Sequence, residues 1–133
     1  MNITRHTLIN EFKDFFHSIF PFLKLEIYDV KSENFNGTNA KIHLSDKSLL
    51  IDLNPQLINH HFDIDSQMEV GKFEKMMLEL YNLNVQVFRQ SSGLWLQTTA
   101  TDHWSLEKQN SKGEHSMNEH NIPPLNVTDF DLN

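Results

Sequence analysis

The sequence contains no cysteine and only four glycines, which are isolated from one another. The first absence excludes disulfides, thiolate nucleophiles and cysteine-ligated zinc. The second excludes a glycine-rich loop that could cradle a phosphate. No apolar run is long enough to cross a bilayer, and the first residues lack the apolar core of a signal peptide. We therefore expect a cytoplasmic protein that makes no membrane contact.

Positive charge is also scarce, because 11 Lys and Arg face 18 Asp and Glu and the formal net charge is −7. Nucleic-acid binders rely on basic residues for phosphate contacts, so we expect no nucleic-acid partner. Hydrophobic residues make up 38% of the chain, a low share that suits one ordered domain followed by a polar tail.

Catalytic and metal-binding signatures are missing as well. His60 and His61 with Asp63 and Asp65 form the densest ligand-type cluster, but neighbouring residues of a strand point to opposite faces. We therefore predict no metal and no cofactor. Asp102-His103 is the only acid–base pair near a rigid element, and Asp102 is better explained as a helix cap. An enzymatic role is not favoured.

The first half of the chain alternates helical and extended patterns. An aromatic stripe predicts a helix over 3–20 that starts at Asn2 or Thr4 and is stopped by Pro21, and alternation predicts a strand over 22–30. Residues 31–39 form a polar loop, and 40–44 suit a short edge strand. Residues 45–54 fit a short helix or a buried strand, with the helix favoured. Alternation then predicts a strand over 61–65.

Residues 68–110 carry the clearest pattern. An amphipathic helix over 68–82, with Ser66 as N-cap, precedes a hairpin over 84–99 that turns at Ser91-Ser92-Gly93. We predict that Val87 faces Leu96 on one side of this hairpin. On the other side, Phe88 faces Trp95 and Gln86 faces Gln97. Thr101 or Asp102 would cap a last helix that ends near Asn110.

These elements predict one small α+β domain over residues 1–110. Its partly antiparallel sheet would hold the first strand, the 61–65 strand and the hairpin, with amphipathic helices mostly on one face. Residues 111–133 have few apolar anchors and two consecutive prolines, so we predict a disordered C-terminal tail.

The hairpin and the residues after it carry a resemblance. Val85-Gln86-Val87-Phe88-Arg89, Gly93, Trp95-Leu96, Thr98-Thr99-Ala100-Thr101-Asp102, Trp104, Leu106 and Gln109 resemble a run in small uncharacterised proteins of Bacteroidota-type bacteria. Residues 20–24 are similar to the first-strand entry of that family, and the resemblance covers roughly residues 20–110. It implies a stand-alone bacterial cytoplasmic domain, and no activity or site residue comes with it.

Two functional hypotheses follow. The first is a non-enzymatic protein-interaction module that binds a protein partner or a second copy of itself through an aromatic sheet face formed by Phe88, Trp95, Gln86 and Gln97. The second is a small-molecule-binding protein or weak enzyme. Its pocket would lie between the first helix and the sheet, with Thr99, Asp102 and His103 at the mouth.

Overall fold

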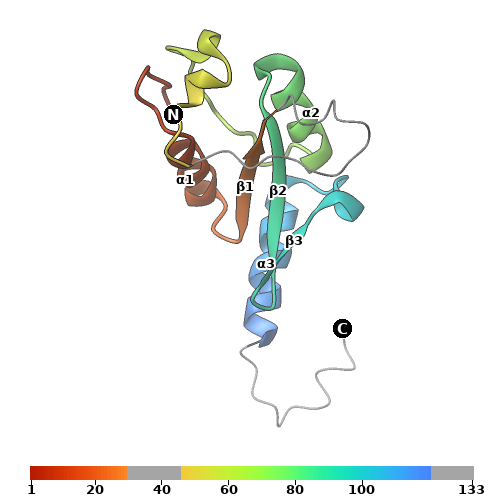
Figure 1. Ribbon diagram of the computed structural model, residues 1–133. Coiled ribbons are helices and arrows are strands. Elements are labelled where there is room, and N and C mark those ends of the chain that lie inside the picture. The colour runs from red at the N-terminus through yellow and green to blue at the C-terminus, as the bar shows by residue number, and fades with distance from the viewer. Residues whose placement is uncertain (30–45, 121–133) are drawn as a thin grey trace, which may run out of the picture.

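The structure, a computed structural model, describes residues 1–29 and 46–120. In chain order its helices and strands are α1 (Ile9–Ile19), β1 (Leu23–Tyr28), α2 (Val70–Tyr81), β2 (Asn84–Ser91), β3 (Leu94–Gln97) and α3 (Leu106–His120) (Figure 1). Short 3-10 turns lie at Leu50–Asp52, Pro55–Leu57 and Thr99–Thr101. The predicted α+β class is confirmed.

The three strands form one antiparallel sheet in the order β1-β2-β3. Ser92 and Gly93 both have positive φ, 51° and 93°, and they form a two-residue turn of the kind that joins tightly paired strands. Arg89 therefore pairs with Leu96, and Phe88 pairs with Gln97. The predicted hairpin register is wrong by two residues. A shift of two leaves every side chain on its predicted face.

One face of the sheet carries the core. Leu25 of β1 and Val87 of β2 are paired and fully buried on it, and α3 lies behind β2 in Figure 1. Phe73 of α2 is buried and stacks on Phe16 of α1, with 5.7 Å between the ring centroids. Leu96, which lies on the same face of the sheet as Val87, is 43% exposed and contributes little to this core.

The helix starts are built by exchange of backbone hydrogen bonds between distant segments. Val70 and Gly71 at the start of α2 donate to the carbonyls of Trp104 and Asp102, at 3.0 and 2.8 Å. In return, Leu106 at the start of α3 donates to Met68, at 3.0 Å. These bonds satisfy N–H groups that a helix terminus leaves free, so the predicted side-chain caps at Ser66 and Asp102 are not used.

The start of α1 repeats this arrangement with the 3-10 turn at Leu50–Asp52. Ile9 donates to the carbonyl of Ser48 at 2.8 Å, and Leu50 donates to that of Thr7 at 2.9 Å. The predicted helix start near Ile3 is therefore wrong. Ile3 is instead buried and exchanges backbone hydrogen bonds with Asn59 and His60.

The C-terminal helix is longer than the sequence predicts. It continues to His120 instead of ending near Asn110, so the predicted tail boundary at 111 is wrong. Gly113 is buried so tightly that an added Cβ would lie 2.9 Å from Cβ of Phe22. Ser116 donates to the Gln90 carbonyl at 3.2 Å. Small residues therefore hold this half of α3 close to the sheet. Residues 121–133 lie outside the described part.

The middle of the chain differs in two respects. The helix favoured over residues 45–54 is not formed as predicted, and the structure has a short 3-10 turn at Leu50–Asp52 instead. The strand predicted over 61–65 is not part of the sheet, because His61 forms only an isolated bridge with Asn2. The loop and edge strand predicted over 31–44 lie outside the described residues.

Candidate interaction surface

The aromatic face proposed from the sequence is partly closed by the protein itself. Phe88 and Trp95 are both half-buried, and they lie on the sheet face opposite Leu25 and Val87. The Lys24 ammonium lies 5.3 Å from the Phe88 ring centroid and 5.1 Å from that of Trp95. Each cation–π contact stabilises a partly exposed ring by about 0.5–1 kcal/mol. Trp95 is directly opposite Gln90, so the predicted Phe88–Trp95 pairing is wrong.

The two predicted glutamines of this face differ from each other. Gln97 is exposed on β3, whereas Gln86 is only 9% exposed. The Gln86 amide donates to the Glu74 carboxylate at 3.2 Å, and the same carboxylate accepts the Val87 backbone N–H at 2.8 Å. Glu74 of α2 therefore closes the edge of β2 beyond the end of β3. Gln86 is therefore engaged by Glu74 within the fold and offers little surface to a partner.

Beside the aromatic face lies a charged hollow of about 290 Å³ between α1 and β1. Lys13 bridges Glu26 and Asp46, with nitrogen–oxygen distances of 2.6 and 2.8 Å. Burial opposes ionisation of both Lys13 and Glu26, but their mutual contact outweighs it. The pKa of Lys13 is therefore raised and the pKa of Glu26 is lowered. Lys13 and Glu26, which line the hollow, are therefore paired with each other as charged groups.

The residues proposed for a ligand mouth do not line this hollow. Thr99 and His103 are exposed on and after the 3-10 turn that follows β3. The Asp102 carbonyl accepts the Gly71 N–H, and its carboxylate packs where a Gly71 side chain would begin, 3.0 Å from the position of an added Cβ. Asp102 therefore supports the start of α2, and the structure does not bring these three residues together around a cavity.

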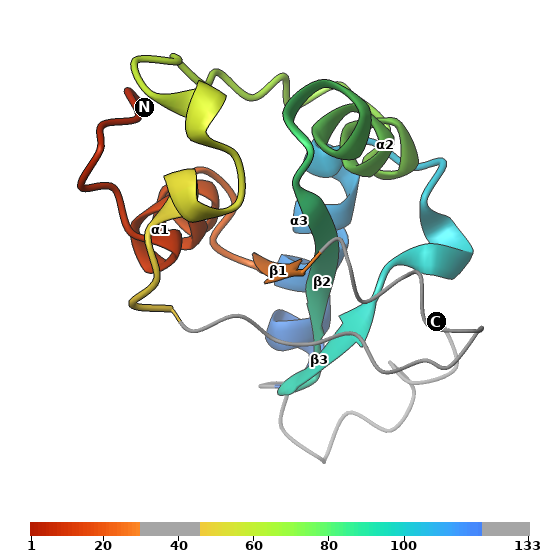
Figure 2. The same ribbon diagram turned by 45° about the horizontal axis from the view of Figure 1, so that its top comes forward.

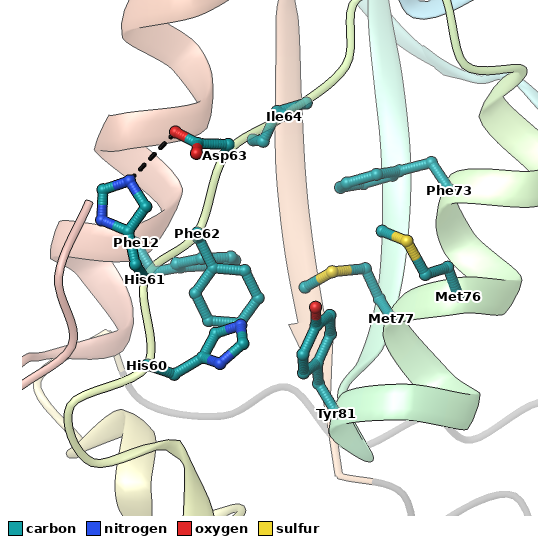
Figure 3. A pocket seen from close by; sticks show the side chains of 10 residues that line it. All are labelled: Phe12, His60, His61, Phe62, Asp63, Ile64, Phe73, Met76, Met77 and Tyr81. Atoms are coloured by element: carbon teal, nitrogen blue, oxygen red, sulfur yellow. Dashed lines mark hydrogen bonds and ion pairs between the residues drawn. The ribbon is translucent and has the colours of Figure 1, made fainter.

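A second cavity of about 210 Å³ opens between α1 and α2 (Figure 3). Its wall includes apolar side chains of Phe12, Phe73, Met76 and Met77 and polar ones of His60, His61, Asp63 and Tyr81. His60 packs edge-on against Phe62 and at a tilt against Tyr81, whereas His61 is bonded to Asp63 at 3.1 Å and to Asn2. His60 is therefore held by aromatic rings, and His61 is held by polar side chains at the surface.

The outer edge of β3 was not singled out by the sequence. Thr98 donates its backbone N–H to the Val87 carbonyl on β2. Because antiparallel hydrogen bonds alternate along a strand, Leu94 and Leu96 also point their backbone groups at β2, and Trp95 and Gln97 point theirs outward. Within residues 1–29 and 46–120, these outward groups have no hydrogen-bond partner. The side chains of Leu94 and Leu96 are 68% and 43% exposed.

Next to β3, on its core-facing side, positive charge gathers around Trp104. The Arg89 guanidinium and the ammonium groups of Lys108 and Lys112 lie 5.7, 4.5 and 5.8 Å from its ring centroid. This cluster contrasts with the acidic balance of the chain as a whole. We call β3 (Leu94–Gln97) and these four residues the β3 strip. Leu94 was overlooked because an isolated leucine beside a turn carries no signal in the sequence.

The comparisons with known proteins leave the family open, since no family model, no curated protein and no solved structure matches the chain. The resemblance to a Bacteroidota-type family therefore stays a prediction. Over residues 1–29 and 46–120, no helix is both long and apolar enough to cross a bilayer. The same residues contain no group of three or more side chains suited to holding a metal ion.

Proposed function

We propose that the chain is a protein-interaction module and that the β3 strip is its binding surface. The observation that carries the proposal is an unpaired edge strand with exposed leucines. Edge strands of soluble proteins are normally protected by charge, proline, a bulge or a covering element. β3 has the sequence Leu-Trp-Leu-Gln, which contains neither charge nor proline, and its outward N–H and C=O groups are free within the described residues.

The neighbouring residues support the same role. Trp95 supplies a large ring that is already held by Lys24, so little side-chain freedom is lost when a partner binds. Trp104, half-buried among three cations, lies on the other side of the strand. Tryptophan and arginine are the residue types most enriched in interface hot spots. A cytoplasmic setting and a bacterial source are part of this proposal, as the sequence suggests.

The cavities favour a small-molecule function less. The cavity between α1 and α2 has a volume of about 210 Å³, below the range of roughly 300–1,000 Å³ that is usual for ligand sites. The larger hollow is lined by Lys13 and Glu26, whose charges are paired with each other. Thr99, Asp102 and His103, the residues proposed for a ligand mouth, line neither of these two cavities.

The absence of cysteine permits a direct test. A single cysteine introduced as Leu94→Cys carries a photo-activated crosslinker, and the labelled full chain is exposed to extract of the native host. Leu80→Cys is the matched control, because Leu80 on α2 is 67% exposed and Leu94 is 68% exposed. We expect a discrete crosslinked protein from position 94 that unlabelled chain competes away.

A crosslinked product supports the proposal only if it forms from position 94 and not from position 80, and only if intact unlabelled chain competes it away. A product that forms equally from positions 94 and 80 would place the contact elsewhere. A product from position 94 that disappears when Leu96→Glu chain replaces the wild type as competitor would reflect non-specific labelling. Sedimentation of the unlabelled chain at matched concentration identifies self-association, in which case the captured protein is a second copy.

A further inference from the structure

We infer that the partner docks on the β3 strip as an extended segment in which acidic side chains alternate with apolar ones. This inference rests on the proposed function and names the chemistry of the partner. The segment would add one strand to the sheet outside β3. It would satisfy the backbone groups of Trp95 and Gln97, the two residues whose N–H and C=O point outward.

The acidic side chains expected in the partner are inferred from the basic flank of α3. Asn110 of this helix accepts the Phe22 backbone N–H at 2.8 Å, so the Asn110 side of α3 faces β1. Lys108 and Lys112 are one turn apart and lie on the opposite side of the helix, toward β3. Together with Arg89, which pairs with Leu96, they form a basic border along the core-facing side of the strip.

Successive residues of an added strand point to alternate faces of the sheet. Those on the α3 side would lie near Leu94 and Leu96, with Lys108 and Lys112 beyond. A glutamate fits there, because its methylene groups cover leucine and its carboxylate reaches a lysine. Residues on the other side would lie beside Trp95, whose ring favours an apolar neighbour. The strip therefore selects acidic side chains on one face and apolar ones on the other.

A second copy of the chain fits the β3 strip less well than an acidic segment does. Antiparallel pairing of β3 with β3 of another molecule is compatible with a two-fold axis. It would, however, bring Arg89, Lys108 and Lys112 of both copies to the same face of one continuous sheet, and like charges at such distances repel. An acidic segment removes this repulsion and gains from the same cations.

The test uses the full chain and a synthetic octapeptide in which valine alternates with glutamate. Binding is followed by fluorescence anisotropy of a labelled peptide, beside a matched peptide with lysine in place of glutamate. We expect the glutamate peptide to bind at least about tenfold more tightly, with a preference that shrinks as salt rises. The two alternating sets of peptide nitrogens are N-methylated in separate peptides, and methylation of the set that faces β3 should abolish binding, because strand addition needs those N–H groups.

Charge reversal supplies the matched variants. Lys108→Glu with Lys112→Glu should reverse the preference toward the lysine peptide. Lys72→Glu with Lys75→Glu on α2 changes the net charge equally at two exposed positions and should leave the preference unchanged. Three results would each overturn the inference: equal binding of the two peptides, equal effects of the two double variants, or binding that survives N-methylation in both of the methylated peptides.

Two other occupants are separated by the same design. Disulfide-linked dimers of a Leu96→Cys variant, without peptide binding, would assign the strip to a second copy. Tighter peptide binding after residues 121–133 are replaced by a glycine–serine segment would mean that the chain's own end occupies the strip, and it would overturn the assignment to a partner. The inference fails in these peptide experiments alone, whereas the proposed function fails when crosslinking from position 94 yields no specific product.

Discussion

The two edges of the sheet are built in opposite ways. At the β1 edge, the Leu23 carbonyl contacts Nδ1 of His17 of α1 at 2.7 Å, and Lys24 and Glu26 place charges on the strand. Lys13 of α1 then ties Glu26 to Asp46. At the β3 edge, the strand is uncharged and two leucines are exposed. Figure 2 shows α1 beside β1, at the end of the sheet away from β3.

This difference is the reason why we place the proposed partner at the β3 edge. Where β2 extends past β3, its Val87 N–H is closed by the Glu74 carboxylate. Within residues 1–29 and 46–120, the strand edges next to α1 and α2 are therefore protected by a helix or a charge, and the β3 edge has no such protection. An edge without protection is an aggregation hazard unless something binds to it, so the bare edge is the natural place to look for function.

The largest expected effect is a loss of stability when buried β1 is changed, in contrast to exposed β3. Leu25 of β1 is fully buried, so Leu25→Ala should lower the free energy of unfolding by about 2–5 kcal/mol. Urea unfolding of the variant and of the wild type measures the difference. A loss below about 1 kcal/mol would mean that β1 is not the better-packed edge.

The next effect concerns the Glu74 closure of β2. Glu74→Ala leaves the Val87 N–H without its acceptor and should cost about 1–3 kcal/mol. Glu79→Ala, on an exposed turn of the same helix, is the control and should cost less than about 0.5 kcal/mol. Equal losses in the two variants would show that Glu74 contributes only to the helix and not to the edge.

Acid should weaken the β1 edge selectively. The pKa of Glu26 is lowered in the folded chain, so its contribution is present above its ordinary pKa and is lost as pH falls through the lowered value. Stability should therefore decline between about pH 5 and pH 3 by less in Glu26→Gln than in the wild type. Urea midpoints across this range test it, and parallel pH profiles for the two proteins would contradict it.

Trp95 separates a binding role from a core role. It is half-buried under Lys24, so Trp95→Ser should cost about 1 kcal/mol through loss of the cation–π contact and partial burial. The same variant should weaken crosslinking to the partner much more strongly. A loss of several kcal/mol in a thermal melt would instead assign Trp95 to the core.

The smallest expected effect lies on β3. Leu94→Glu should change stability by no more than about 0.5 kcal/mol, as should Leu80→Glu on α2, because both residues are about two-thirds exposed. Only the β3 variant should impair partner capture. A clear loss of stability for Leu94→Glu alone would show that the leucine packs within the fold.

The sequence predicted those elements whose apolar residues repeat at a regular spacing. α2, β1 and the hairpin were predicted near their true positions. The α+β class followed from these elements. The two faces of the hairpin were also correct, because a register error of two residues preserves them.

The rest depended on contacts between distant segments. Ile3 fits a helix face by its spacing, yet its backbone is hydrogen-bonded to Asn59 and His60. The second half of α3 has little apolar pattern, because Gly113 and Ser116 provide close approach and hydrogen bonds instead of hydrophobic bulk. The strip was missed for a similar reason: the exposure of Leu94 depends on which strand ends the sheet.

Backbone amide exchange in the isolated chain tests the exposed β3 edge most directly. The amides of Leu96 and Thr98 point at β2 and should exchange slowly, whereas those of Trp95 and Gln97 point outward and should exchange fast. NMR-detected hydrogen exchange at low protein concentration resolves all four. Alternating slow and fast exchange is the predicted result. Trp95 and Gln97 amides that are protected as well as those of Leu96 and Thr98 in the free monomer would contradict the account.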